Sequence, residues 1–146
     1  MMKHILVAVD FAQSSERAVD VAIDLARALA ARITLVHSSA VPVVAYESSA
    51  ASLTDLVTPW SEARVAQMKE RVADVRRRWP HVDGLVREEP PIEGVLATAR
   101  EVAADLIVVG THARHGVERL LLGSIAEGIL RDAPVPVLVV RAHAAP

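Results

Sequence analysis

The sequence predicts an α/β fold built on a five-stranded, mostly parallel, doubly wound sheet with helices on both faces. Short apolar runs alternate with segments of helical periodicity in the order βαβαβαβαβ, which favours a parallel sheet. Hydrophobic residues make up 52% of the chain and aromatic residues only 3%, so the core must consist of Val, Leu, Ile and Ala. Such a core suits parallel strands covered by Ala-rich helices. Because the 146 residues contain no linker and no repeat, we expect one domain over residues 1–146.

The first strand and helix are indicated by a change of hydrophobic period. Residues 5–9 form a continuous apolar run, which is typical of a central strand buried on both faces. Ser14 or Ser15 can cap the helix that follows, and Glu16 in its first turn suits the helix dipole. Apolar residues then recur at helical spacing as far as Leu29.

The middle of the chain predicts a second strand and a long helix. Residues 33–37 are apolar and rich in β-branched side chains, as expected for a strand. Residues 38–53 are small and show no clear period, so we expect a loop. A helical pattern begins at about Thr54 and ends before Pro80. Its single apolar stripe consists of Val65, Met68, Val72, Val75 and Trp79.

The last third of the chain completes the alternation. Residues 82–86 form a weaker strand, interrupted by Gly84, which we expect at an edge of the sheet. Pro90 and Pro91 stand where a helix can begin, and apolar residues follow at helical spacing. The remaining elements are a buried strand, a short helix and a last strand, at residues 105–109, 124–130 and 135–140.

The last strand also predicts a homodimer. Pro136 cannot donate a ladder hydrogen bond, so this strand lies at an edge or begins just beyond the proline. An apolar edge strand must be covered, and pairing with the same strand of a second subunit covers it. The predicted interface residues are Val135, Val137, Leu138, Val139 and Val140.

Composition excludes several classes of function. The net charge is −2 and the basic residues are scattered, so neither nucleic acid nor an anionic membrane is an expected partner. The chain has no cysteine, which excludes disulfides, thiolate metal sites and thiol catalysis. The apolar run in MMKHILVAVD is too short for a signal peptide, and no apolar stretch approaches the ~18 residues of a membrane span. We therefore expect a cytoplasmic protein.

Two loops follow central strands, and ligands of doubly wound sheets bind at such loops. One opens at Asp10 and the other at Gly110. A helix starts downstream at Gly123 and Ser124, where free N–H groups, a hydroxyl and the helix dipole suit phosphate oxygens. The intervening basic side chains outnumber Glu118 and are His112, Arg114, His115 and Arg119. From these residues alone, a structural turn with a helix cap remains an equal alternative.

Three segments resemble the universal stress protein family, and together they cover nearly the whole chain. They are HILVAVDFAQSSERAVDVAIDLA, ITLVHS and GTHARHGVERLLLGSIAEGILRDAPVPVLVV. The resemblance implies a Rossmann-like fold of the adenine nucleotide alpha hydrolase type. It also implies a stress-response regulatory protein that binds ATP, with Mg²⁺ entering only through the ATP phosphates.

The resemblance also implies a nucleotide site. The Gly-x2-Gly-x9-Gly-Ser/Thr pattern of the nucleotide-binding branch maps onto Gly110, Ala113, Gly123 and Ser124. It places Asp10 at the ribose and adenine end, Ser38 and Val109 beside the base, and the start of the last helix at the phosphates. The implied site residues are Ala8, Asp10, Ser38, Val109, Gly110, His112, Ala113, Arg114, Gly123, Ser124 and Ile125.

Two departures from the family pattern predict weaker nucleotide binding. Ala113 replaces a glycine, and a Cβ in a left-handed conformation costs about 1–2 kcal/mol, or roughly tenfold in affinity. Glu89 stands where many relatives have glycine, and its carboxylate would repel a triphosphate. A dimeric interaction protein that binds no nucleotide is therefore the main alternative.

Catalysis and a resident metal have little support in the sequence. No serine lies in a Gly-x-Ser-x-Gly elbow, and no Walker lysine follows the glycines, so at most weak ATP hydrolysis is expected. His112 and His115 lack a nearby cysteine and a fixed helical face, so no protein metal site is expected. His37 is interpreted as a satisfied, half-buried residue, and Asp10 can cap the next turn as well as act as a base or bind Mg²⁺.

Overall fold

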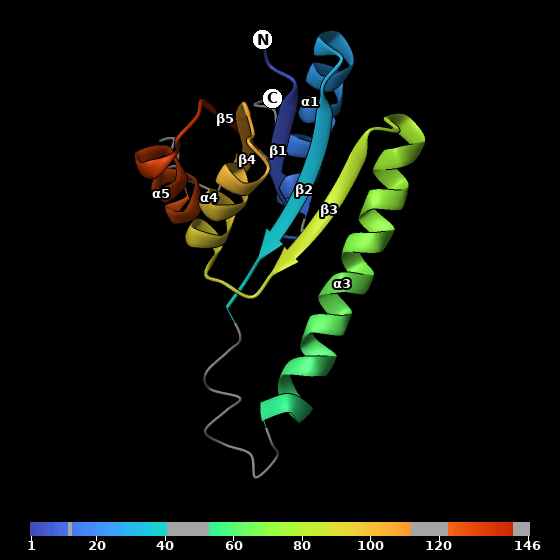
Figure 1. Cartoon of the computed structure of the whole chain (residues 1–146), viewed down its shortest axis with the longest axis vertical. Helices are drawn as coiled ribbons and strands as arrows, with labels where there is room; N and C mark the ends of the chain where they lie inside the picture. Colours follow the sequence, from blue (N-terminus) through green and yellow to red (C-terminus); the bar gives the residue numbers. More distant parts are fainter. Residues whose placement is uncertain (12, 41–52, 112–122, 142–146) are drawn as a thin grey trace, which may run out of the picture.

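The computed structural model describes residues 1–11, 13–40, 53–111 and 123–141 (Figure 1). The strands are β1 (His4–Ala8), β2 (Arg32–Ser38), β3 (Val82–Arg87), β4 (Leu106–Thr111) and β5 (Val137–Arg141). The helices are α1 (Gln13–Leu29), α3 (Leu53–Arg78), α4 (Pro91–Glu101) and α5 (Ser124–Asp132).

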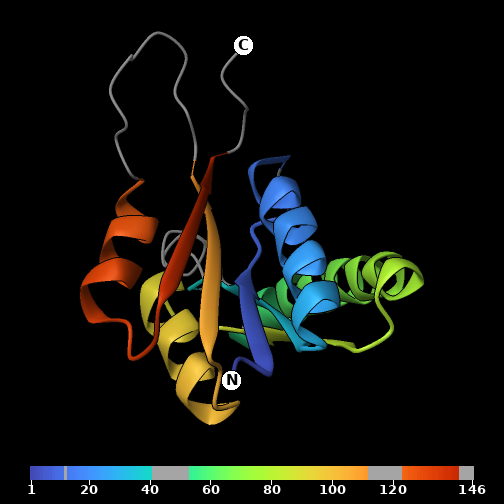
Figure 2. The same ribbon diagram turned by 90° about the horizontal axis from the view of Figure 1, so that it is seen from above.

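The strands form one sheet in the order β3-β2-β1-β4-β5, and every pair of neighbours is parallel. Helices α1 and α3 cover one face, and α4 and α5 cover the other (Figure 2). The predicted doubly wound sheet is thus confirmed, and the sheet is parallel throughout. Strand β1 lies at the centre, as its unbroken apolar run predicts. Strand β3, which contains Gly84, and strand β5, which follows Pro136, lie at the two edges, also as predicted.

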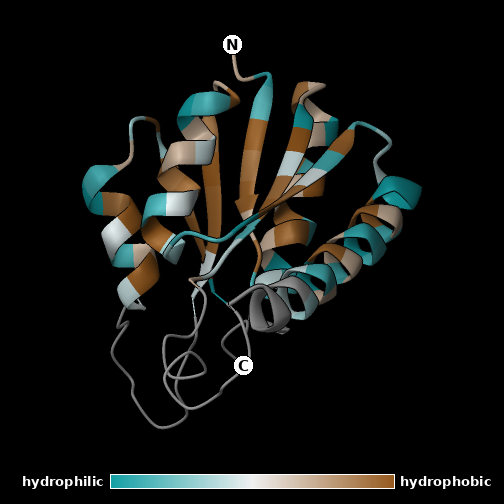
Figure 3. Cartoon of the chain, turned by 60° about the horizontal axis from the view of Figure 1, so that its bottom comes forward, coloured by the Kyte–Doolittle hydropathy of each residue, from teal (hydrophilic) through white to brown (hydrophobic). Residues whose placement is uncertain are grey.

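The core consists of two layers, one on each side of the sheet. Ile5 and Val7 pack toward α1 and α3, whereas Leu6 packs toward α4 and α5. All three side chains are 0% exposed, which accounts for the absence of polar alternation in β1. In Figure 3 the central strands are mostly hydrophobic in colour, whereas the helices carry both hydrophilic and hydrophobic residues.

Helix α3 packs closely on β3 because of one glycine. A Cβ on Gly84 would lie 2.6 Å from Val72 and 2.7 Å from Met68, so only glycine allows this approach. Met68, Val72 and Val75 are buried, as the predicted stripe requires, whereas Val65 is 41% exposed. The N-terminal part of α3 projects beyond the ends of the strands (Figure 1).

Several boundaries differ from the sequence prediction. Helix α1 begins at Gln13, so Ser14 and Ser15 lie inside the first turn and the predicted serine N-cap is wrong. Before this helix, Phe11 adopts a left-handed conformation with φ 60°. Strand β4 continues to Thr111. Strand β5 begins at Val137, so the predicted interface residue Val135 lies outside it.

Among the residues that the structure describes, none of the helices is long and apolar enough to cross a membrane.

Candidate functional site

The site predicted from the sequence lies where the strand order reverses. From β1 the chain proceeds to β2 and β3 on one side, whereas β4 and β5 lie on the other side. The carboxyl ends of β1 and β4 therefore flank the switch point, the usual ligand position in an open α/β sheet.

Several predicted residues come together at this edge, on the side covered by α4 and α5. Ala8 ends β1 and Val109 lies near the end of β4, and both pack in the apolar layer beneath these helices. Ser38 ends β2, and its hydroxyl donates to the carbonyl oxygen of Glu89, two residues before α4. Asp10 is exposed two residues beyond β1, and its backbone N–H lies 3.4 Å from the Ser15 Oγ.

The central part of the glycine pattern lies outside the described residues, and so do His112, Ala113, Arg114, His115, Glu118 and Arg119. Gly110 belongs to β4 and is partly buried, beside its register partner Val140 in β5.

The start of α5 has the features of an anion site. Gly123 is the N-cap, and no side chain of the described residues caps the helix. Ser124 and Ile125 in the first turn are both exposed. The first N–H groups of a helix have no partner within the helix and carry the positive end of its dipole, so they suit phosphate oxygens.

The described residues leave the space in front of Gly123 open. Among the described residues, no atom beyond its chain neighbours lies within 4 Å of the position that a Cβ would take. Its φ of −57° is accessible to any L-amino acid. Neither packing nor backbone geometry within the described residues therefore requires glycine here.

The Ser38 side chain has a structural role. Ser38 is only 7% exposed, and its hydroxyl donates to the Glu89 carbonyl oxygen at 2.6 Å. A Cβ on Gly94 would lie 1.8 Å from the Ser38 Oγ, so the hydroxyl fits against the first turn of α4 only because residue 94 is glycine. A ligand would contact the Ser38 backbone rather than its hydroxyl. Sequence analysis missed Gly94, although a glycine inside a helical pattern is a signal of close packing.

The Glu89 carboxylate is held by a neighbouring guanidinium. Arg87 contacts Glu89 Oε1 at 2.5 Å and Glu101 Oε2 at 2.6 Å. Hydrogen bonds to Glu101 and then Glu89 raise the pKa of Arg87 above its usual range. This pairing reduces the repulsion that the sequence predicts between Glu89 and a triphosphate, because the Arg87 guanidinium partly offsets the negative charge of the Glu89 carboxylate.

His37 is a satisfied residue, as predicted, although it is more deeply buried than expected at 8% exposure. Its Nδ1 lies 2.8 Å from the Val9 carbonyl oxygen and its Nε2 lies 3.1 Å from the Ser39 Oγ. Burial, together with the positive charge of Arg64, lowers the pKa of His37 below its usual value. The ring stacks on Phe11, with centroids 4.4 Å apart and an angle of 33° between the planes.

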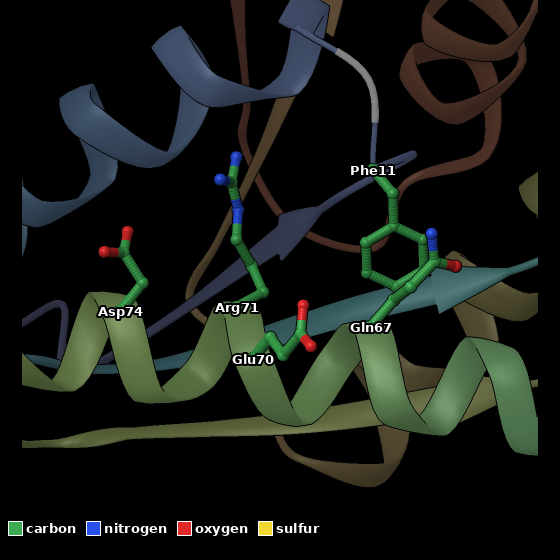
Figure 4. A pocket seen from close by; sticks show the side chains of 5 residues that line it. All are labelled: Phe11, Gln67, Glu70, Arg71 and Asp74. Atoms are coloured by element: carbon green, nitrogen blue, oxygen red, sulfur yellow. The ribbon is translucent and has the colours of Figure 1, made fainter.

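Sequence analysis did not identify Phe11 as important. The available signal was that the only phenylalanine of the chain directly follows Asp10. Its ring also lines an open groove of about 240 Å³ between α1 and α3 (Figure 4). The other lining residues are Gln67, Glu70, Arg71 and Asp74. This groove is on the face of the sheet opposite α5, so it is distinct from the open space at Gly123.

A family model described as the universal stress protein family matches residues 1–141. The chain belongs to this family. A universal stress protein of Thermus aquaticus is 35% identical over 147 residues, covering 97% of this chain and 100% of the relative. Membership confirms the resemblance inferred from the three sequence segments.

Solved universal stress proteins share the fold. A crystal structure of one in complex with cAMP has a TM-score of 0.68 and 22% identity, covering 97% of this chain and 98% of that protein. A universal stress protein from Archaeoglobus fulgidus in complex with dAMP has a TM-score of 0.65 and 23% identity, with coverages of 96% and 99%.

The described part of this universal stress protein has no cluster of three or more His, Cys, Asp or Glu residues that could hold a metal ion. What it offers a ligand is a helix N-terminus without a side-chain cap, together with the ends of β1, β2 and β4. This arrangement can bind an anionic group of a ligand and hold the rest of the ligand across the sheet edge.

Proposed function

We propose that this protein is a regulatory stress-response protein that binds an adenine nucleotide at the carboxyl edge of its sheet, with ATP as the expected ligand. The observation that carries the proposal is the start of α5, where the described residues leave the helix N-terminus without a side-chain cap and the space at Gly123 open. Universal stress proteins in complex with cAMP and dAMP add support, since both ligands are adenine nucleotides.

The nucleotide would lie across the switch point. Its phosphates would bind the N–H groups at Gly123, Ser124 and Ile125, and its ribose would approach Asp10. The base would lie beside the backbone of Ser38 and Val109. His112, Ala113 and Arg114 belong to the proposed site through the sequence pattern, and Mg²⁺ would enter only with the phosphates.

Binding rather than catalysis is the proposed activity, with the protein acting as a cytoplasmic homodimer. No set of described residues is arranged to activate a water molecule against a phosphate. An ordered nucleotide would instead change the surface that a partner protein meets.

Calorimetry on nucleotide-stripped protein tests the proposal. ATP, AMP and cAMP are titrated with and without Mg²⁺, and ADP release is measured separately over many turnovers. Micromolar binding with one site per subunit supports the proposal. No binding of any of the three at millimolar concentration rejects it and favours a dimeric interaction protein that binds no nucleotide.

A further inference from the structure

His37 contacts the chain on both sides of Asp10. Its Nδ1 lies 2.8 Å from the carbonyl oxygen of Val9, and its ring stacks on Phe11 with centroids 4.4 Å apart. Asp10 is the single residue between these two contacts. His37 belongs to β2, the neighbour of β1 in the sheet, so an adjacent strand holds the segment that carries Asp10.

The conformation of Phe11 makes this support necessary. Its φ of 60° is in the left-handed region, which a residue with a large side chain adopts only when its surroundings hold it there. The ring packs against His37 and against the apolar layer beneath α1 and α3. Figure 4 shows the ring pointing toward α3, with Gln67 beside it.

His37 is itself fixed by hydrogen-bond chemistry. A carbonyl oxygen only accepts, so Nδ1 carries the proton and donates to Val9. Nε2 of the neutral ring then accepts from the Ser39 hydroxyl at 3.1 Å. With both nitrogens engaged and the residue 8% exposed, the ring has one orientation and one tautomer.

We propose that His37 is a positioning residue that holds the Val9-Asp10-Phe11 turn, so that Asp10 is presented to the ribose of the nucleotide. This inference rests on the proposed function. His37 acts from the α1 and α3 face of the sheet, opposite the face on which Ala8 and Val109 pack. It therefore affects binding through Asp10 without touching the ligand.

Two substitutions separate the two contacts. His37→Asn keeps an N–H group near the Nδ1 position and loses the ring, whereas His37→Phe keeps the stacking and loses both hydrogen bonds. His37→Ala loses both contacts. We expect His37→Ala to weaken ATP binding by about tenfold, with the other two variants intermediate.

A matched control is present at the opposite end of the sheet. His4 is also a buried strand histidine, 5% exposed, with Nδ1 2.9 Å from the Val102 carbonyl oxygen and Nε2 2.7 Å from the Thr34 Oγ1. His4→Ala should cost comparable stability without changing ATP affinity. An equal loss of affinity in His4→Ala and His37→Ala would show a general structural effect and overturn the inference.

The deciding experiment is a double-mutant cycle with Asp10→Asn, measured by calorimetry on protein shown to be folded by circular dichroism. If His37 acts through Asp10, His37→Ala weakens ATP binding in the wild-type background and has little further effect in Asp10→Asn. Binding of inorganic tripolyphosphate, which has no ribose, should be unchanged in both variants. Additive losses, or an equal loss for tripolyphosphate, would overturn the inference.

The two proposals fail in different ways. Wild-type protein that binds no adenine nucleotide refutes the proposed function. Wild-type protein that binds ATP, together with a folded His37→Ala variant of equal affinity, leaves the function standing and refutes the role of His37.

Discussion

Ser38 and Gly94 are so close that a Cβ on residue 94 would lie 1.8 Å from the Ser38 hydroxyl oxygen. The contact joins the end of β2 to the first turn of α4, and the same hydroxyl donates to the Glu89 carbonyl oxygen. The edge of the proposed nucleotide site therefore depends on the absence of a single methyl group.

Gly94→Ala should destabilise the protein. Alanine in a helix normally gains up to about 1 kcal/mol over glycine, but the clash forces Ser38 or α4 to move. We expect the free energy of unfolding in urea to fall by about 1–3 kcal/mol.

Gly128→Ala in α5 is the control for Gly94→Ala. Its Cβ would meet the Ile92 Cδ1 at 2.3 Å, and the end of this flexible side chain can rotate away. Its effect should stay within about 1 kcal/mol of wild type. Equal effects of the two substitutions would contradict the importance of the Ser38 contact.

Gly123→Val should abolish or strongly weaken ATP binding while the protein stays folded. The φ of −57° accepts a branched residue, and the side chain would enter the open space proposed for the phosphates. Calorimetry should show a loss of at least about tenfold in affinity, equivalent to 1.4 kcal/mol. Unchanged affinity in a folded variant would place the phosphates elsewhere.

Ala113→Gly should strengthen ATP binding. The family pattern has glycine at this position, and a Cβ costs about 1–2 kcal/mol if the backbone is left-handed there. We expect an increase of roughly tenfold in affinity, measured in parallel with wild type. An unchanged affinity would show that residue 113 needs no such conformation.

The sequence predicted the central elements well because their surroundings are uniform. Residues 5–9 are apolar without alternation since β1 is buried on both faces, and Gly84 and Pro136 correctly indicated the edges. The start of α1 was predicted wrongly because the left-handed turn at Phe11 has no local pattern in the sequence.

The site was less accessible from the sequence, because its contacts join distant segments. The Ser38–Gly94 contact spans four elements of the chain, and the stacking of Phe11 on His37 joins the turn after β1 to the end of β2. Hydrophobic periods predict which face a residue occupies, but they do not predict which side chain from another element it meets there.

Acidification should reduce stability through His4 and His37. Burial is the main cause that lowers the pKa of each in the folded state, with added repulsion from Arg32 and Arg64 respectively. In the unfolded chain these histidines have a pKa of about 6.5, so below that pH the unfolded state binds more protons than the folded state. The stability that depends on the neutral histidines is therefore complete above that pH and falls as the pH drops toward the folded-state pKa.

Urea unfolding at a series of pH values between about 7.5 and 5 measures this dependence, because most carboxylates stay ionised over that range. His4→Asn removes one of the two titrating groups and should flatten the slope. Hydrogen bonds from the Lys3 and His4 N–H groups lower the pKa of Asp105, so protonation of Asp105 destabilises the protein only at more acidic pH. A wild-type stability that is constant across the range would contradict the lowered histidine pKa values.

The homodimer proposed through β5 can be tested with a charge at the edge of the sheet. Val137, Leu138 and Val139 are only partly buried, because β5 has β4 as its one neighbour. Val137→Lys should desolvate two like charges across a symmetric interface and give a monomer in analytical ultracentrifugation at concentrations where wild type is dimeric.

Leu85→Lys on β3 is the matched control, since Leu85 is 39% exposed and lies on the opposite edge strand. Dissociation by Leu85→Lys and not by Val137→Lys would move the interface to β3, whereas a monomeric wild type would remove it altogether.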